Sequence, residues 1–233
     1  MQILLIGYGK MGKAIEKVAF ERGHQIAGRI DLNDHPPYPH ADVAIEFSQP
    51  ESAIENIRQC IHQKIPVICG TTGWLKKKEE VEDYCLKNDG TLFYSSNFSM
   101  GVNIFFRLSE YLAHLMDRHP EYDVTINETH HTQKKDAPSG TAITLAEGII
   151  RKLARKKEWV TPKPSNAESL VISSIRIDPA PGTHVVKYQS AVDDIEIRHT
   201  AHSREGFARG AVLVAEWLPG KKGIFSMDDF LKF

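Results

Sequence analysis

Two adjacent histidines and a lysine close behind them are the residues of this sequence best suited to acid–base chemistry. His130 and His131 stand side by side, and Lys134 follows His130 by four positions. Histidine titrates near neutral pH, so His130 can donate and recover a proton during a reaction. Lys134 carries a compact positive charge that can hold a carboxylate or deliver a proton to a nitrogen. These residue types predict an anionic substrate whose reduction requires a proton.

A predicted helix over residues 142–157 begins just after this group. Either Ser139 or Thr141 can cap it, and the backbone N–H groups of Gly140 and Thr141 would then point outward from its positive end. Such a helix start is a ready site for a carboxylate. The alternative is structural, since such residues also decorate solvated loops and residues 138–141 can be a turn and a cap. We favour the functional interpretation, because binding and catalytic residues concentrate on loops.

A glycine-rich turn near the N-terminus indicates a dinucleotide site. It follows an apolar strand-like run over residues 2–6, opens a predicted helix over residues 13–22, and leads to a second strand over residues 24–30 that ends at Asp31. Glycines let the pyrophosphate approach the helix start, and the acid can accept hydrogen bonds from the adenosine ribose. A turn that serves only strand–helix packing would leave Asp31 unexplained. The turn consists of Gly7, Tyr8, Gly9, Lys10, Met11 and Gly12.

Three further strands, expected over residues 43–48, 66–69 and 91–94, complete a parallel sheet. A helix from Pro50 and a charged helix over residues 75–86 separate them. In an open parallel sheet, ligands bind beyond the carboxyl ends of the strands. We therefore expect the small polar residues at those ends to line one cleft with the glycine turn. They are Ser48, Gln49, Gly70, Thr71, Thr72, Gly73, Ser95, Ser96, Asn97 and Phe98.

The pattern changes near Met100 and predicts a second, smaller domain. Its expected elements are a helix over residues 102–114, the helix over residues 142–157, and strands over residues 122–128, 169–178, 183–190 and 193–200. A helix over residues 206–217 would return to the first domain. We expect an α/β protein with a Rossmann-type parallel-sheet domain of residues 1–99 and 205–233. Residues 100–204 would form an α+β substrate and oligomerisation domain with a mixed sheet.

Composition limits the classes of partner. The 233 residues carry 29 basic and 30 acidic side chains, a formal charge of −1, so nucleic acid and anionic membranes are not expected partners. Cys60, Cys69 and Cys85 lack the spacing of a metal site and are expected to be reduced thiols. The N-terminal apolar run is too short for a signal peptide or membrane span, so we expect a cytoplasmic protein.

These motifs resemble those of the 4-hydroxy-tetrahydrodipicolinate reductases of lysine biosynthesis, also called dihydrodipicolinate reductases, over essentially the whole chain. The most specific part is Glu128-x-His130-His131-x-x-Lys134-x-Asp136-Ala137-Pro138-Ser139-Gly140-Thr141. Supporting parts are the glycine turn, Glu46-Phe47-Ser48, Gly70-Thr71-Thr72-Gly73, and Ile195-Glu196-Ile197-Arg198-His199.

The resemblance implies an enzyme that uses NADH or NADPH to reduce a cyclic hydroxylated dicarboxylate with loss of water. It implies that His130 is the general acid and that Lys134 helps to deliver the proton and bind a carboxylate. His131, Gly140 and Thr141 would be substrate ligands. The glycine turn, Asp31 and residues 70–72 and 95–98 would bind the cofactor. The family also implies a homotetramer assembled through the sheet of the second domain.

The residue after Asp31 bears on the choice of cofactor. Many members of the family carry an arginine there that can meet the 2′-phosphate of NADPH, whereas this chain has Leu32. An acid accepts a hydrogen bond from a free 2′-hydroxyl and repels a phosphate. We therefore expect a preference for NADH, although Arg29 and Lys10 leave NADPH open.

Two other functions remain as alternatives. The first is another two-domain Rossmann dehydrogenase that acts on a small carboxylate, and the second is a non-catalytic NAD-sensing protein. Neither explains why Pro138-Ser139-Gly140-Thr141 follows two histidines so closely. A metal site of His130, His131, His199 and His202 is conceivable by residue type, but without a matching acid or cysteine pattern we expect no metal.

Overall fold

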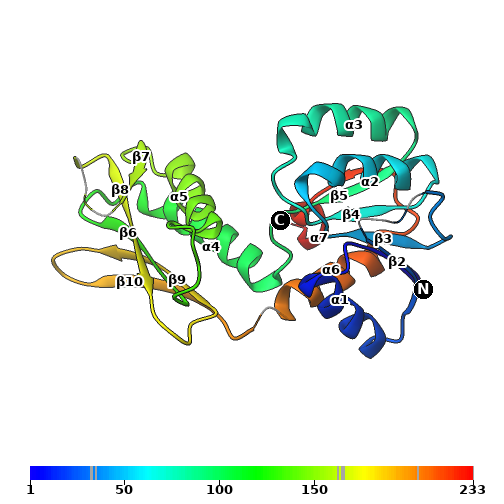
Figure 1. The fold of residues 1–233 in the computed structure, drawn as a ribbon. Helices are drawn as coiled ribbons and strands as arrows, with labels where there is room; N and C mark the ends of the chain where they lie inside the picture. The colour runs from blue at the N-terminus through cyan, green and yellow to red at the C-terminus, as the bar shows by residue number, and fades with distance from the viewer. Residues whose placement is uncertain (32–33, 35, 162, 164–165, 204, 233) are drawn as a thin grey trace. The chain divides into compact units, whose positions relative to one another are not determined.

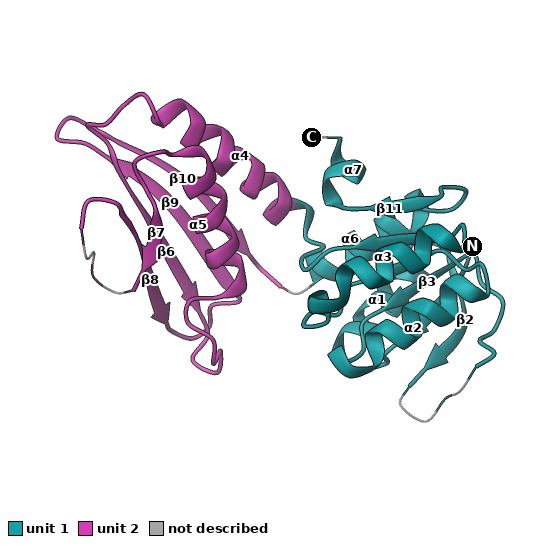
Figure 2. Cartoon of the chain, turned by 90° about the horizontal axis from the view of Figure 1, so that it is seen from above, with its two compact units in different colours: residues 1–100, 205–233 teal, residues 101–204 magenta. Residues whose placement is uncertain are grey.

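The computed structural model describes residues 1–31, 34, 36–161, 163, 166–203 and 205–232. The chain divides into two compact units (Figure 2). Unit 1 consists of Met1–Met100 and Glu205–Phe233, and unit 2 is Gly101–Arg204. The chain thus leaves unit 1 once and returns to it with its last helices.

Unit 1 is built on a six-stranded parallel sheet in the order β11-β5-β4-β3-β1-β2. Its strands are β1 (Gln2–Ile6), β2 (Gln25–Ile30), β3 (Val43–Glu46), β4 (Val67–Cys69), β5 (Thr91–Tyr94) and β11 (Gly223–Phe225). Its helices are α1 (Lys10–Glu21), α2 (Pro50–His62), α3 (Lys78–Lys87), α6 (Glu205–Trp217) and α7 (Met227–Leu231), with a short 3₁₀ turn, η1 (Leu75–Lys77), before α3.

Helices cover both faces of this sheet (Figure 1). Alternate residues of β1 show why: Ile3 and Leu5 pack in the core formed with α1 and α6, while Leu4 and Ile6 pack in the core formed with α2 and α3. A strand buried on both faces must be apolar throughout, and this produces the continuous apolar run in the sequence. The parallel α/β class expected from the sequence is confirmed.

Unit 2 is a five-stranded mixed sheet in the order β10-β9-β6-β8-β7. Its strands are β6 (Asp123–His130), β7 (Glu158–Val160), β8 (Ser169–Arg176), β9 (Gly182–Gln189) and β10 (Asp194–Ala201). β6 pairs parallel with β8 and antiparallel with β9, and β10 pairs antiparallel with β9. The helices α4 (Met100–Met116) and α5 (Gly140–Lys152) contribute Phe105, Ala113, Leu145 and Ile149 to the core over one face of this sheet.

Several predicted boundaries were wrong. β6 continues to His130, two residues beyond the predicted end, so His130 lies on a strand and not on a loop. α5 ends at Lys152 and not at residue 157. The reason is that the side chains beyond it bind other backbone segments: Arg155 donates to the carbonyls of Met116 and Tyr122, and the buried ammonium of Lys156 donates to those of Ala167 and Ser169. The short elements β7, β11 and α7 were not predicted.

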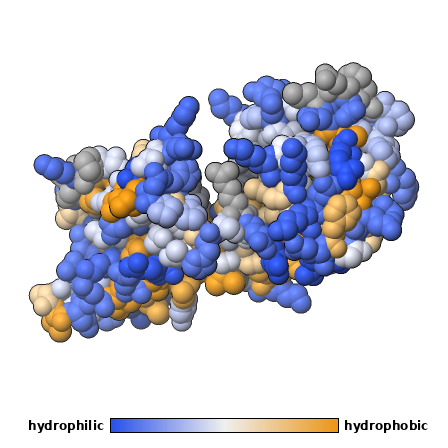
Figure 3. Space-filling model, turned by 60° about the horizontal axis from the view of Figure 1, so that its bottom comes forward, coloured by the Kyte–Doolittle hydropathy of each residue, from blue (hydrophilic) through white to orange (hydrophobic). Residues whose placement is uncertain are grey.

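Polar and charged residues cover most of the face drawn in Figure 3, where hydrophobic residues form smaller groups.

Cys60, Cys69 and Cys85 are buried and unpaired, and burial raises the pKa of each thiol, that of Cys85 to about 11. Among the described residues, no helix combines the length and apolar character that crossing a membrane requires.

Candidate active site

A row of four polar side chains crosses the helix-covered face of the unit 2 sheet. Ser174 of β8 pairs with Glu128 of β6, which pairs with His184 of β9, which in turn pairs with His199 of β10. Residues in register on neighbouring strands put their side chains on the same face. The row one layer further in consists of Ile172, Ile126, Val186 and Ile197. The face therefore changes from apolar to polar toward the carboxyl end of β6, where the predicted catalytic histidine lies.

Glu128 is the centre of this row and is completely buried. Its carboxylate accepts hydrogen bonds from the Ser139 N–H at 3.1 and 3.2 Å, from Ser174 Oγ at 2.7 Å and from Arg176 Nη2 at 3.1 Å. Burial by itself raises the pKa of Glu128, but these donors and His184 outweigh it and hold the pKa well below its usual range. Glu128 is therefore a fixed negative charge beneath the site.

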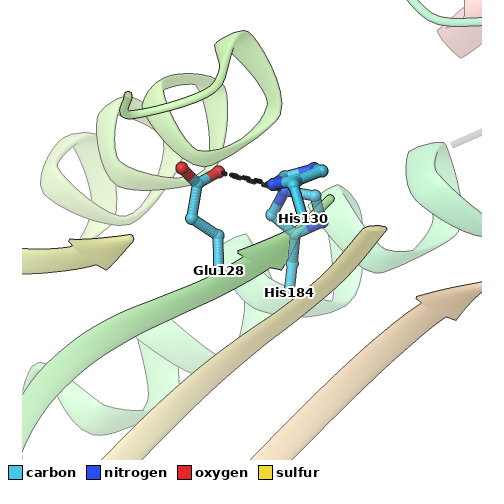
Figure 4. A group of neighbouring side chains, drawn as sticks. All are labelled: Glu128, His130 and His184. Atoms are coloured by element: carbon cyan, nitrogen blue, oxygen red, sulfur yellow. Dashed lines mark ion pairs between the residues drawn. The ribbon is translucent and has the colours of Figure 1, made fainter. Parts of the chain in front are cut away.

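His130 is also buried, only 6% exposed, and lies beside Glu128 (Figure 4). Its Nδ1 is 3.5 Å from Glu128 Oε2 and has no hydrogen-bond partner among the described residues. The His184 ring meets it edge-on, with 5.0 Å between centroids. Burial, followed by the charges of His184, Lys134 and Arg176, lowers the pKa of His130 to about 4, against the opposing effect of Glu128. His130 is therefore neutral at pH 7 in the free protein.

Arg176 joins the loop after β6 to the sheet. It is in register with His130, and its Nη2 donates both to Glu128 and to the carbonyl of Asp136, at 2.6 Å. Its Nε donates to the carbonyl of Lys134 at 3.4 Å. The ammonium of Lys134 contacts both carboxylate oxygens of Asp136, at 2.7 and 2.8 Å, and this ion pair lowers the pKa of Asp136. The loop that carries Lys134 is thus held against the end of β6.

The start of α5 has an open backbone. Of the two predicted caps, the structure has Ser139, whose Oγ accepts from the Ala142 N–H at 3.2 Å and also lies 3.2 Å from His184 Nε2. The N–H groups of Gly140 and Thr141 come first in the helix and have no partner within its own hydrogen-bond ladder. A Cβ on Gly140 would meet no atom within 4 Å, so a ligand can approach this backbone closely.

His131, half-buried after β6, lies near enough to Asp178 to help lower the pKa of that carboxyl, after the larger effect of Thr132.

In unit 1, the three glycines of the turn have different surroundings. Gly7 has a φ of +88°, and a Cβ there would come 2.1 Å from the carbonyl oxygen of Phe47. A Cβ on Gly12 would come 2.3 Å from the carbonyl oxygen of Gly7, whereas one on Gly9 would meet nothing within 4 Å. Gly7 and Gly12 are therefore required by the fold of the turn. Gly9, at the N-cap of α1, leaves the helix start open to a ligand.

A cavity of about 280 Å³ lies in front of this turn. Of the predicted cofactor residues, Gly7, Tyr8, Gly9 and Asp31 line it. Ser48 and Gln49, which were expected to share this cleft, line it too. The structure adds Ile6, Ile30, Asp34, Phe47, Ser52 and Asn56. Glycine backbone, a carboxylate for the ribose and an uncapped helix start fit a dinucleotide, which would supply hydride.

The other predicted cofactor residues lie outside the lining of this cavity. Lys10 is exposed, Met11 packs against the core and Gly12 is buried in the turn. Thr71 Oγ1 accepts from the Ser48 N–H at 2.8 Å, and Gly70 lies against the Phe47 ring. Thr72 and Ser96 are exposed, Ser95 Oγ donates to the carbonyl of buried Asn97 at 2.7 Å, and Phe98 packs in the core. Leu32 lies outside the described residues.

Models of one enzyme family match the chain in two parts. The model described as dihydrodipicolinate reductase, N-terminus, matches residues 33–98, and that described as dihydrodipicolinate reductase, C-terminus, matches residues 101–231. A 4-hydroxy-tetrahydrodipicolinate reductase of Christiangramia forsetii is 46% identical over 99% of this chain and 98% of its own length. The chain belongs to this family.

Two further comparisons agree. The 4-hydroxy-tetrahydrodipicolinate reductase of Methanosarcina mazei is 36% identical over 96% of this chain and 86% of its own length. A solved dihydrodipicolinate reductase from Paenisporosarcina sp. TG-14, described as dipicolinate-bound, shares the fold with a TM-score of 0.77 and 20% identity over 97% of both chains. As a member of the dihydrodipicolinate reductase family, the chain is an NAD(P)H-dependent oxidoreductase of lysine and diaminopimelate biosynthesis that acts on 4-hydroxy-tetrahydrodipicolinate.

Sequence reasoning missed His184, Ser174 and Arg176 of this dihydrodipicolinate reductase. It included Glu128 in the motif without a role. The three missed residues come from strands far along the chain and meet Glu128 only through the register of the sheet. A usable signal was present, because each is a polar residue inside a predicted strand, in the same alternation as apolar residues that are buried.

The structure also groups different residues from those weighed as a metal site. Glu128, His130 and His184 place one possible ligand atom each within 4.8 Å of one another. However, the Glu128 carboxylate already accepts from a guanidinium, a hydroxyl and a backbone N–H. The guanidinium and the hydroxyl reach Oε1, so Oε2, which faces both histidines, is the oxygen left to accept a hydrogen bond from an imidazole.

Proposed function

We propose that unit 2 binds the dicarboxylate substrate and protonates it through His130, while unit 1 binds NADH as the hydride donor. Overall the substrate gains a hydride and a proton and loses one water to become tetrahydrodipicolinate. The observation that carries this assignment is the grouping of His130, Lys134 and the open N-terminus of α5 around the end of β6. The bound dipicolinate named for the solved relative supports a dicarboxylate at such a site.

The substrate carboxylates would meet Lys134, His131 and the N–H groups of Gly140 and Thr141. Backbone donors at a helix start are already oriented, and the helix dipole favours negative charge there. Lys134 would exchange part of its contact with Asp136 for a substrate carboxylate. Because this ion pair is partly exposed, its rearrangement costs about 1 kcal/mol or less.

The proton would come from His130 after the substrate has bound. In the free protein His130 is neutral at pH 7, since burial and the neighbouring cations keep its pKa at about 4. A bound dianion offsets the charges of Lys134 and Arg176 and so favours the imidazolium. His130 would then donate to the ring as negative charge develops on it, a contribution of about 10²–10⁴-fold in rate.

The cofactor of unit 1 is proposed to be NADH. Asp31 and Asp34 both line the cavity, and two carboxylates disfavour the extra phosphate of NADPH. Arg29, which could have met that phosphate, is paired with Glu16. Gly7, Tyr8 and Gly9 would hold the pyrophosphate. Residues 70–72 and 95–98, at the ends of β4 and β5, are proposed to lie toward the nicotinamide.

We further propose a homotetramer assembled through the unit 2 sheet. Its face opposite α4 and α5 exposes Ile175 of β8, at 52%, which a second subunit would cover. Sedimentation velocity checks the mass, and the substitution Ile175→Lys, which puts a charge on that face, should reduce the tetramer. An unchanged mass in that variant would place the interface elsewhere. The expected cytoplasmic location stays a prediction.

The function is tested by following cofactor oxidation while the unstable substrate is made in place by a synthase from pyruvate and aspartate semialdehyde. Oxidation that requires the synthase, faster with NADH than with NADPH, is the expected result. Oxidation that proceeds without the synthase would favour another dehydrogenase. Folded protein that binds NADH but oxidises none would favour a sensing role.

A further inference from the structure

Glu128 Oε2 is shared by two histidines. His130 Nδ1 lies 3.5 Å from this oxygen, and His184 Nε2 lies 3.6 Å from it (Figure 4). The other carboxylate oxygen accepts from Ser174 and Arg176, and the Ser139 N–H reaches both. Oε2 is thus the side of the carboxylate that remains for an imidazole, and it has two candidates.

We propose that Glu128 and His184 are positioning residues for His130 that act in opposite directions on its proton. This inference rests on the proposed role of His130 as the general acid. Glu128 would accept a hydrogen bond from His130 Nδ1–H when the imidazolium forms, and His184 would compete for the same oxygen. In the free protein neither histidine lies within ordinary hydrogen-bond distance of Oε2, and His130 Nδ1 has no hydrogen bond among the described residues.

The geometry allows this bond to form with little movement. A separation of 3.5 Å exceeds an N–H···O hydrogen bond by a few tenths of an ångström. Catalytic hydrogen bonds are often long in unliganded enzymes and shorten in the complex. With Nδ1–H held by Glu128, the transferable proton is on Nε2. After transfer the ring is neutral, Nδ1–H stays in place, and a proton from solvent restores Nε2–H.

Glu128 would act as a charge and not as a proton carrier. Its donors hold its pKa well below the usual range, so the carboxylate stays ionised while His130 changes state. His184 is fixed by its own register with Glu128 and by Ser139 Oγ. The other charged groups that face His130 are Lys134 and Arg176, and both oppose its protonation. Among the described residues, Glu128 is therefore the one neighbour that favours the imidazolium.

Two conservative variants separate the roles. In E128Q the side chain keeps its shape and one acceptor oxygen but loses its charge. We expect kcat to fall by up to about 10²-fold and the alkaline limb of the pH–kcat profile to move to lower pH by about one unit. In H184Q the amide can still bond Ser139 but carries no charge, so the electrostatic effect by which His184 lowers the pKa of His130 is lost. We expect the alkaline limb of that variant to move to higher pH.

The matched control is Glu110→Gln, in which a half-buried carboxylate of unit 2 loses its ion pairs with Arg107 and Arg151. Its pH profile should match the wild type, and the KM for NADH should be unchanged in all three variants. Limbs that do not move in E128Q and H184Q, or that move the same way, would overturn the proposal. If E128Q does not fold, H184Q alone tests the proposal. Loss of a histidine with a purely structural role would not move the alkaline limb of the pH–kcat profile to higher pH.

Two further outcomes are distinguishable. Wild-type protein without synthase-dependent turnover would refute the proposed function itself, whereas active wild type with unmoved limbs refutes only this inference. A stoichiometric metal found by mass spectrometry in the purified enzyme, together with loss of turnover after dialysis against a chelator, would also overturn it. Glu128, His130 and His184 would then be ligands.

Discussion

The Arg29 guanidinium is paired with the Glu16 carboxylate, with Nε donating to Oε1 at 2.7 Å. It also lies over the Tyr8 ring, 5.5 Å from the centroid. The pair joins β2 to α1 beside the glycine turn. Arg29 is the arginine nearest to Asp31 in sequence, and this ion pair holds its guanidinium. An exposed ion pair is weak, so it biases the choice of cofactor without preventing NADPH binding.

Replacing Asp31 by alanine should therefore weaken NADH far more than NADPH. The carboxylate is proposed to accept from the ribose 2′-hydroxyl, a hydrogen bond to a charged group worth about 1.5–3 kcal/mol, and to repel a 2′-phosphate. The dissociation constants of both cofactors, measured by titration calorimetry, check this expectation. Equal weakening of the two cofactors would contradict the assignment of Asp31.

The glycine turn offers a pair of identical substitutions with different expected results. Gly12→Ser should lower the free energy of unfolding by about 1–3 kcal/mol, because its Cβ would overlap the carbonyl of Gly7. Gly9→Ser should leave stability nearly unchanged, since serine is a good N-cap and a Cβ there meets no protein atom. Its NADH affinity should nevertheless fall about tenfold, equivalent to about 1.4 kcal/mol.

Denaturant titration and NADH binding distinguish these two glycines. If Gly9→Ser bound NADH as well as the wild type does, the pyrophosphate would not lie over the start of α1. A stable Gly12→Ser variant would show that the turn can rearrange to make room for a Cβ at residue 12.

Replacing Lys134 by alanine should reduce kcat/KM greatly without affecting stability or NADH binding. The side chain lies on a loop and contacts Asp136, and its loss removes a proposed substrate ligand.

His130→Gln should reduce kcat by about 10²–10⁴-fold and also lower stability somewhat, because this residue is buried on β6. Loss of NADH binding in either variant would argue against separate substrate and cofactor sites.

The low pKa of His130 also predicts acid sensitivity. Free histidine titrates at 6.5 and His130 at about 4, so between these values the unfolded chain binds a proton that the folded chain does not. Stability should therefore fall as the pH drops from 6.5 toward 4. The depressed pKa of Glu128 adds a second loss, because its stabilisation is present above its ordinary value of 4.5 and disappears below it.

Thermal unfolding of the wild type and His130→Gln across this pH range isolates the first contribution. The variant should lose less stability than the wild type between pH 6.5 and 4, since its residue 130 cannot titrate. Parallel curves would show that His130 is not desolvated in the folded protein.

The features that the sequence determined by itself are local ones. The glycine turn between a strand and a helix, the acid after β2, a cap at Ser139 or Thr141, and the spacing of His130 to Lys134 all lie within short segments. Periodicity and turn chemistry act over such distances, and they were sufficient for the α/β class and the family resemblance. Elements of three to five residues, such as β7, β11 and α7, are too short to show a period.

Only the tertiary structure decided what surrounds His130. Ser174, Arg176 and His184 lie more than forty residues after His130 in sequence, and Ser174 and Arg176 contact Glu128 at separations of 46 and 48. Strand register places them beside Glu128, and a slip of one residue would turn each side chain to the other face. Register depends on the packing of the whole sheet against α4 and α5. The buried charge that supports the proposed acid was therefore not readable from any single stretch of the chain.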